Sequence, residues 1–106
     1  MRKITTFVLS TLVSFLTYGQ YIQTISYETW SSENWQNLAK GTYTFDSNDY
    51  MTNYLYEIWD NPTNSYKIKD QVNYTNNGNG TVQQSISQNW NTTTNNWENS
   101  QRSTYT

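Results

Sequence analysis

Apolar and polar residues alternate with a period of two along much of the chain. Within residues 66–74 the apolar side chains take alternate positions, with lysine or amide side chains between them, and these apolar residues are Tyr66, Ile68, Val72 and Tyr74. Residues 82–90 alternate in the same way. This period is typical of half-buried β-strands, in which every second side chain points to the same face. We therefore predict that Tyr66, Ile68, Val72 and Tyr74 share one face of a strand.

Segments rich in Asn, Asp, Gly and Pro separate the alternating stretches, as at residues 60–64 and 76–80. These residue types tolerate positive φ or preset a turn. Because glycine accepts positive φ without strain, replacing Gly78 or Gly80 with Val should destabilise the fold more than the same change at Ser85.

Turns this short join antiparallel neighbours. The sequence therefore predicts an all-β fold, an antiparallel meander of about six strands near residues 21–30, 35–45, 51–59, 66–75, 81–90 and 97–106.

An aromatic pattern recurs along the chain. Trp30, Trp59 and Trp90 are separated by 29 and 31 residues, and each is followed after five or seven residues by a second aromatic residue. Eight residues further on comes a Tyr-Thr pair, three times in all. Recurrence at a fixed spacing indicates repeated supersecondary units. We predict a β-hairpin repeat domain over residues 20–106, with units of about 31 residues near 21–50, 51–80 and 81–106, the last of them incomplete.

Two segments of these units carry a family resemblance. Residues 43–49 read Tyr-Thr-Phe-Asp-Ser-Asn-Asp and residues 74–80 read Tyr-Thr-Asn-Asn-Gly-Asn-Gly. They resemble the Tyr-Thr-Tyr-Asp-x-Asn-Gly units that recur with Trp-Asp turns in secreted bacterial repeat proteins, and they are distantly similar to tyrosine-aspartate (YD) repeats. The resemblance implies long β-hairpins wound into a sheet or shell, in an extracellular protein, and it supplies no catalytic residues.

Residues 1–19 have the layout of a secretory signal peptide. Arg2 and Lys3 give a positive start, and residues 4–16 form an apolar run without charge. Residues 17–19 then place small side chains at the −3 and −1 positions of a cleavage site before Gln20. The alternative is an uncleaved membrane anchor, but the run is shorter than the roughly 20 residues that span a bilayer. We expect cleavage and a secreted protein, extracellular or at the cell surface with the periplasm as the alternative, without a membrane partner afterwards.

Composition excludes several function classes. The chain has no Cys and no His, which removes disulfides, thiolate zinc sites and the commonest general base. Residues 20–106 hold four basic and eight acidic residues, and this acidic balance disfavours nucleic acid as a partner. Asn, Thr, Ser and Gln make up 45 of these 87 residues, a polarity that by itself suggests disorder. The same segment also holds 15 aromatic residues, so we expect it to fold.

The remaining candidates for chemistry are few. Asp46, Asn48 and Asp49 flank a turn and offer oxygen atoms to Ca²⁺, but such residues more often bond their own backbone. Glu28, Glu57 and Gln88 recur at one repeat position, and a glycosidase would need a second carboxylate and a cleft. We therefore predict no enzyme activity, no catalytic residue, no metal site and no cofactor.

Six aromatic side chains stand at the mouths of the predicted hairpins and form the candidate site, namely Trp30, Trp35, Trp59, Tyr66, Trp90 and Trp97. Cross-strand aromatic pairs stabilise hairpins, so their simplest role is to clamp the turns. We predict a structural or adhesive repeat that self-associates or meets neighbouring repeats through its sheet edges. The alternative is a carbohydrate-binding module whose exposed rings stack on a glycan. Burial of Trp30, Trp59 and Trp90 under a second layer would favour the structural role, and an exposed row would favour binding.

Overall fold

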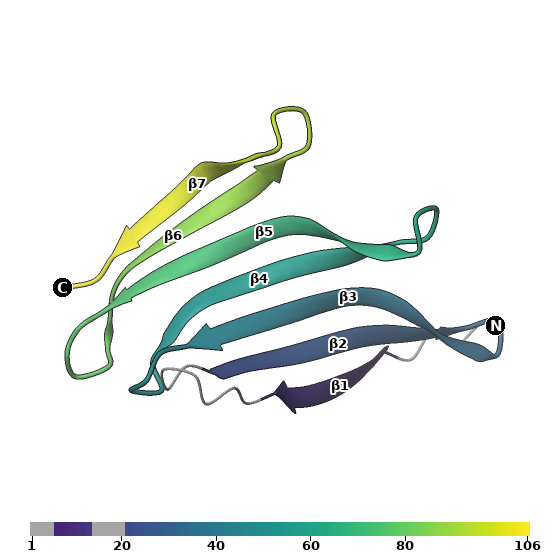
Figure 1. Cartoon of the computed structure of the whole chain (residues 1–106), viewed down its shortest axis with the longest axis horizontal. Coiled ribbons are helices and arrows are strands. Elements are labelled where there is room, and N and C mark those ends of the chain that lie inside the picture. The colour runs from purple at the N-terminus through teal and green to yellow at the C-terminus, as the bar shows by residue number, and fades with distance from the viewer. Residues whose placement is uncertain (1–5, 14–20) are drawn as a thin grey trace.

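The computed structural model describes residues 6–13 and 21–106, and within these ranges the fold is all-β. The strands form one antiparallel sheet in which spatial order follows chain order, so the sheet is a meander (Figure 1). The strands are β1 (Thr6–Val13), β2 (Tyr21–Ser31), β3 (Asn34–Phe45), β4 (Met51–Asp60), β5 (Ser65–Asn76), β6 (Val82–Asn91) and β7 (Asn96–Thr104).

The predicted meander is confirmed, and the six predicted strands correspond to β2–β7. A seventh strand, β1, pairs antiparallel with β2 and lies within the predicted signal peptide. The rest of that peptide, residues 1–5 and 14–19, lies outside the described residues. Cleavage before Gln20 stays a prediction, as does the repeat length of about 31 residues.

The described residues form a single layer, without a second sheet or a helix against either face (Figure 1). Among residues 21–106, Ala39 and Gly41 are the residues that are fully buried. The molecule measures 50 × 33 × 28 Å along its principal axes, whereas the spacing of stacked sheets implies a layer about 10 Å thick. The sheet is therefore strongly twisted.

β-Bulges determine which residues share a face. In β5, Ile68 pairs with Glu57 and Asp70 pairs with Tyr56, so Lys69 is an extra residue. Such an insertion shifts the following side chains to the opposite face. The prediction that Tyr66 and Ile68 share a face with Val72 and Tyr74 is therefore wrong, because the bulge places the first two with Gln71 and Asn73 instead.

One face of the sheet is lined with tyrosine, and we call it the tyrosine face. Tyr21 stacks on Phe45 with ring centroids 4.5 Å apart, and Tyr43 lies 4.7 Å from Tyr54. The register places these rings on the same side as Ala39 and Gly41. The tyrosine face therefore combines close aromatic contacts with the two fully buried residues of the described sheet.

The turns at the aromatic ends of the hairpins use residues in the left-handed region. Ser32 and Glu33 have φ of 53° and 64°, and Asn64 and Asn95 both have φ of 54° in the other two hairpins. At the opposite end of the sheet Gly80 has φ of 90°, whereas Gly78 is not among the positive-φ residues. A Cβ at Gly78 would meet nothing within 4 Å. The structure therefore gives a reason why Gly80→Val should destabilise the fold, and it gives none for Gly78→Val.

Candidate functional site

The six predicted aromatic residues all lie on the face opposite the tyrosine face, which we call the tryptophan face. Each hairpin places two of them directly opposite each other, and the pairs are Trp30↔Trp35, Trp59↔Tyr66 and Trp90↔Trp97. All three pairs are T-shaped, with ring centroids 5.2, 5.0 and 5.1 Å apart. This edge-to-face geometry is favourable for aromatic rings, so each pair clamps its hairpin.

No second layer of described residues covers these rings. Trp30 and Trp35 keep 38% and 45% of their surface exposed, and the other four members of the set are half-buried. Of the three tryptophans that distinguish the predicted roles, Trp30 is therefore exposed, whereas Trp59 and Trp90 are half-buried without a second layer of described residues over them.

The hairpins separate from one another toward their aromatic ends. Pairing between β5 and β6 runs only as far as Asp70↔Asn89, and pairing between β3 and β4 only as far as Ala39↔Ile58. Beyond these residues the three hairpin ends diverge like fingers (Figure 1). The facing edges of the fingers carry exposed apolar side chains, among them Leu38, Ile58 and Ile68.

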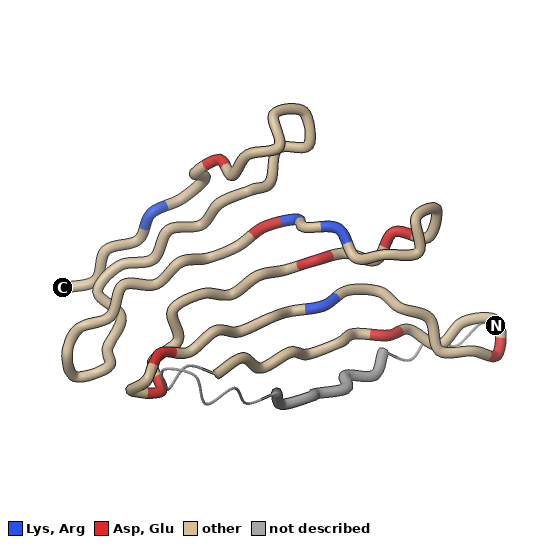
Figure 2. The backbone as a smooth tube through the Cα atoms, viewed as in Figure 1, with Lys and Arg blue, Asp and Glu red and all other residues tan. Residues whose placement is uncertain are grey.

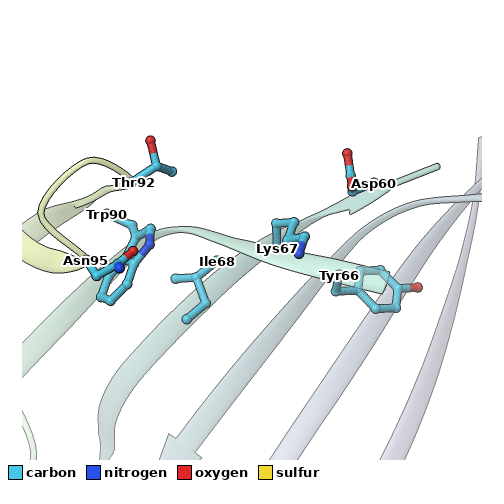
Figure 3. A pocket seen from close by; sticks show the side chains of 7 residues that line it. All are labelled: Asp60, Tyr66, Lys67, Ile68, Trp90, Thr92 and Asn95. Carbon is cyan, nitrogen blue, oxygen red and sulfur yellow. The ribbon is translucent and has the colours of Figure 1, made fainter. Parts of the chain in front are cut away.

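A hollow of about 560 Å³ lies between the second finger, which is the end of the β4–β5 hairpin, and the third finger, which is the end of the β6–β7 hairpin (Figure 3). Tyr66, Ile68 and Trp90 provide its apolar lining, and its polar lining comes from Asp60, Lys67, Thr92 and Asn95. Its volume falls within the range of small-molecule sites. Two of the six predicted aromatic residues, Tyr66 and Trp90, thus line the same hollow. Trp30 and Trp35 lie in the β2–β3 hairpin and do not line it.

Some polar groups around the hollow are held by the turn between β4 and β5. Asp60 Oδ2 accepts hydrogen bonds from the Thr63 hydroxyl at 2.6 Å and the Thr63 amide at 3.3 Å. The indole N–H of Trp59 donates to Asn61 Oδ1 at 2.9 Å. These contacts hold the carboxylate of Asp60 and the ring of Trp59 in place within the turn.

Tyr66 is also connected to the first hairpin. Lys40 Nζ lies 4.5 Å from the centroid of its ring and 3.5 Å from Glu57 Oε1. Figure 2 shows charges of opposite sign on these neighbouring strands. Burial raises the pKa of the Tyr66 hydroxyl, the charges of Glu28 and Glu57 add to this effect, and a hydrogen bond with Ser26 opposes it. Because Lys40 lies over the ring of Tyr66, Trp90 is the better stacking surface in the hollow.

A ladder of amide side chains crosses the tryptophan face from β4 to β7. Asn53 Nδ2 donates to Gln71 Oε1 at 3.1 Å and to Asn73 Oδ1 at 2.8 Å. Gln71 and Asn73 both donate to Gln88 Oε1, at 2.7 and 3.1 Å, and Gln88 Nε2 donates to Asn99 Oδ1 at 2.7 Å. We call these five residues the amide ladder.

The residues considered for Ca²⁺ binding and for carboxylate chemistry take part in local contacts. Asp46 Oδ1 accepts from the amides of Asn48 and Tyr50 at 2.8 and 3.0 Å, so it bonds its own turn. Glu57 pairs with Lys40, and Gln88 belongs to the amide ladder. No cluster of three metal-ligating side chains occurs within the described residues. The same residues contain no helix of the length and hydropathy that would cross a membrane.

No protein-family model and no curated protein sequence matches this chain. Its fold is similar to the crystal structure of a protein of unknown function from Bacteroides fragilis NCTC 9343, with a TM-score of 0.73 and 12% identity, over 92% of this chain and 69% of that one. It is also similar to DUF3836 family proteins from Bacteroides vulgatus ATCC 8482, with a TM-score of 0.64, 12% identity and coverage of 88% and 90%, and from Parabacteroides distasonis ATCC 8503, with a TM-score of 0.65, 11% identity and coverage of 91% and 89%. Identities this low show a shared fold alone. The resemblance to Tyr-Thr-Tyr-Asp and YD repeats stays a prediction from the sequence.

Proposed function

We propose that this protein is a non-catalytic carbohydrate-binding module that holds a glycan in the hollow between its second and third fingers. The observation that carries the proposal is the lining of the hollow, to which the Trp90 indole, Ile68 and Tyr66 give apolar surface and four further side chains give polar groups. The C–H groups on the face of a sugar ring carry partial positive charge, and the face of an indole carries negative charge. The carboxylate of Asp60, the ammonium of Lys67 and the amide of Asn95 are suited to bond sugar hydroxyls.

No second layer of described residues covers the tryptophan face, which supports the same proposal. The Trp90 indole is held by its cross-strand partner Trp97, and it also lines the hollow, where it can meet a ligand. The predicted secretion is consistent with this proposal, because an exported module meets glycans outside the cell or in the periplasm.

A glycan array followed by calorimetric titration of the retained glycans tests the proposal. Trp90→Leu should lower the affinity for a retained glycan at least tenfold, because it removes the stacking surface of the hollow. Trp30→Leu is the matched control, since it also removes one indole from a T-shaped pair but lies in another hairpin. Absence of any retained glycan, or equal binding by the wild type and Trp90→Leu, would contradict the proposal.

The second candidate is a structural or adhesive role, and the scarcity of buried residues favours it. With only Ala39 and Gly41 fully buried among residues 21–106, both faces of the sheet remain available to extracellular material. Retention on insoluble extracellular material that free oligosaccharides do not release would support this role. Release by a soluble glycan would support the binding module instead.

A further inference from the structure

The outer edge of β7 is one of the two open edges of the described sheet, the other being that of β1. In the strand order β7 has β6 on one side and no described strand on the other. An open edge presents unpaired backbone N–H and C=O groups to other chains. Such edges are commonly protected by proline or by rows of charge, whereas β7 contains no proline and only two charged residues, Glu98 and Arg102.

The amide ladder ends at this edge with a donor unused. Asn99 accepts from Gln88 through Oδ1, and no hydrogen bond within the described residues uses its Nδ2. Every other ladder member donates through its own amide nitrogen to the next strand. Ladders of Asn and Gln side chains add stability where like strands stack side by side. An amide oxygen on a further strand would therefore continue the series.

We propose that two copies of this chain pair through β7 in an antiparallel arrangement, with a two-fold axis at Asn99. On the axis each Asn99 Nδ2 donates to Asn99 Oδ1 of the second copy, because an amide oxygen has two lone pairs and Gln88 uses one. The same side chain thus supplies the donor and the acceptor, as the self-complementary surface of a symmetric dimer requires. The amide ladder then runs without interruption through both sheets.

The register set by this axis is supported by a bulge. In β7, Asn99 pairs with Gln88 and Gln101 pairs with Ser87, so Ser100 is the extra residue. Counting outward from Asn99 and passing over Ser100, Trp97 of one copy lies opposite Arg102 of the other. The bulge places both on the tryptophan face, since Trp97 pairs with Trp90 and Arg102 with Ile86. A guanidinium beside an indole is a favourable cation–π contact.

A hollow along β7 can accept the Trp97 indole of the second copy. It measures about 340 Å³ and is lined by Ile86, Asn99, Ser100, Gln101 and Arg102. The outer surface of Trp97 from the second copy would fill it against Ile86 and Arg102. On the opposite face Glu98 would lie across from Gln101, so the register brings no like charges together. The dimer does not depend on glycan binding, because Trp90 stays outside the contact.

Sedimentation velocity of the purified protein over a concentration series tests the pairing. The wild type should shift toward a dimer as its concentration rises, and Asn99→Asp should remain monomeric at the same concentrations. That variant keeps the oxygen that accepts from Gln88, so the single chain stays folded, but it sets two carboxylates against each other on the axis. Asn89→Asp is the matched control, because it makes the same charge change on β6, which is not an edge strand, and it should dimerise as the wild type does.

Oxidative crosslinking tests the register. The chain contains no cysteine, so a single introduced thiol reports on one position. Directly opposed Cα atoms in an antiparallel pair are about 4.5–5.5 Å apart, which suits a disulfide. Asn99→Cys should therefore crosslink to itself, whereas Ser103→Cys should not, because its opposite residue is Asn96. A monomer at every concentration, an unaffected dimer in Asn99→Asp, or a crosslink at residue 103 in place of residue 99 would overturn the proposal.

Discussion

The ring of Tyr54 on β4 lies against the backbone of Gly41 on β3. A Cβ at residue 41 would come within 2.9 Å of Cε2 of Tyr54 and 3.0 Å of its hydroxyl oxygen. The bare backbone of Gly41 thus gives the Tyr54 ring its position on the tyrosine face, between Tyr43 and Tyr56. A ring packed over a strand glycine compensates for the missing side chain.

Gly41→Val should therefore destabilise the protein. The added side chain must displace the Tyr54 ring from its contacts, and such overpacking costs about 1–3 kcal/mol. The free energy of unfolding from urea titration measures the effect. Gly78→Val is the control, because a Cβ there meets nothing within 4 Å, and an equal loss in both variants would contradict the role of the Tyr54 contact.

Alkaline pH should destabilise the fold through Tyr54. Burial, followed by the neighbouring Tyr43 and Tyr27 hydroxyls, raises the pKa of Tyr54 from 10.0 to about 12. The unfolded chain releases this proton near its ordinary pKa and the folded chain keeps it longer. Stability is therefore fully present below about pH 10 and falls as the pH rises toward about 12.

Urea unfolding at several pH values measures this loss, and Tyr54→Phe separates its source. The variant has no hydroxyl to ionise at residue 54, so its stability should fall less steeply between about pH 10 and 12 than that of the wild type. The raised pKa values of Tyr66 and Tyr74 leave part of the slope in place. Parallel slopes in the two proteins would contradict the assignment.

The Trp30–Trp35 pair should show a measurable coupling energy. Its edge-to-face contact at 5.2 Å is worth about 0.5–1.5 kcal/mol beyond the area that it buries. A double-mutant cycle with Trp30→Val, Trp35→Val and the double variant isolates that pairwise contribution. Additive losses of stability would mean that the two rings do not clamp the first hairpin.

Gln88→Met should destabilise the sheet by about 1–3 kcal/mol, because it leaves the amide donors of Gln71 and Asn73 without their acceptor in a half-buried place. Gln84→Met is the matched control, since Gln84 lies on the same strand and the same face and takes no part in the amide ladder. Equal midpoints of urea unfolding for the two variants would count against a stabilising ladder.

Strand positions could be predicted from the sequence, but the two faces of β5 could not. Period-two alternation locates a strand because it reflects its geometry, and all six predicted ranges agree with the structure closely. A single extra residue at Lys69 exchanges the faces of everything after it, and lysine fits an exposed bulge and an exposed strand position equally well.

The amide ladder and the hollow were also missed in the sequence. Gln71, Asn73 and Gln88 look like ordinary solvent-facing residues, because their hydrogen bonds depend on the stagger between hairpins and not on any local pattern. Asn95 and Lys67 come together in the hollow only because the fingers diverge. The aromatic residues were predictable, since their spacing marks the mouth of each turn.

The order of the strands has a consequence for folding kinetics. Each described strand pairs with its neighbours in the chain, so every strand pairing joins two consecutive strands. Joining consecutive strands costs less chain entropy than joining strands that are distant in the chain, which favours rapid folding. A row of nearest-neighbour units without a shared core also loses cooperativity, as in solenoid proteins. In the monomer, backbone amides should therefore exchange with solvent along a gradient, fastest in β7 at the open edge and slowest around β4, so that the single chain frays strand by strand before it unfolds globally.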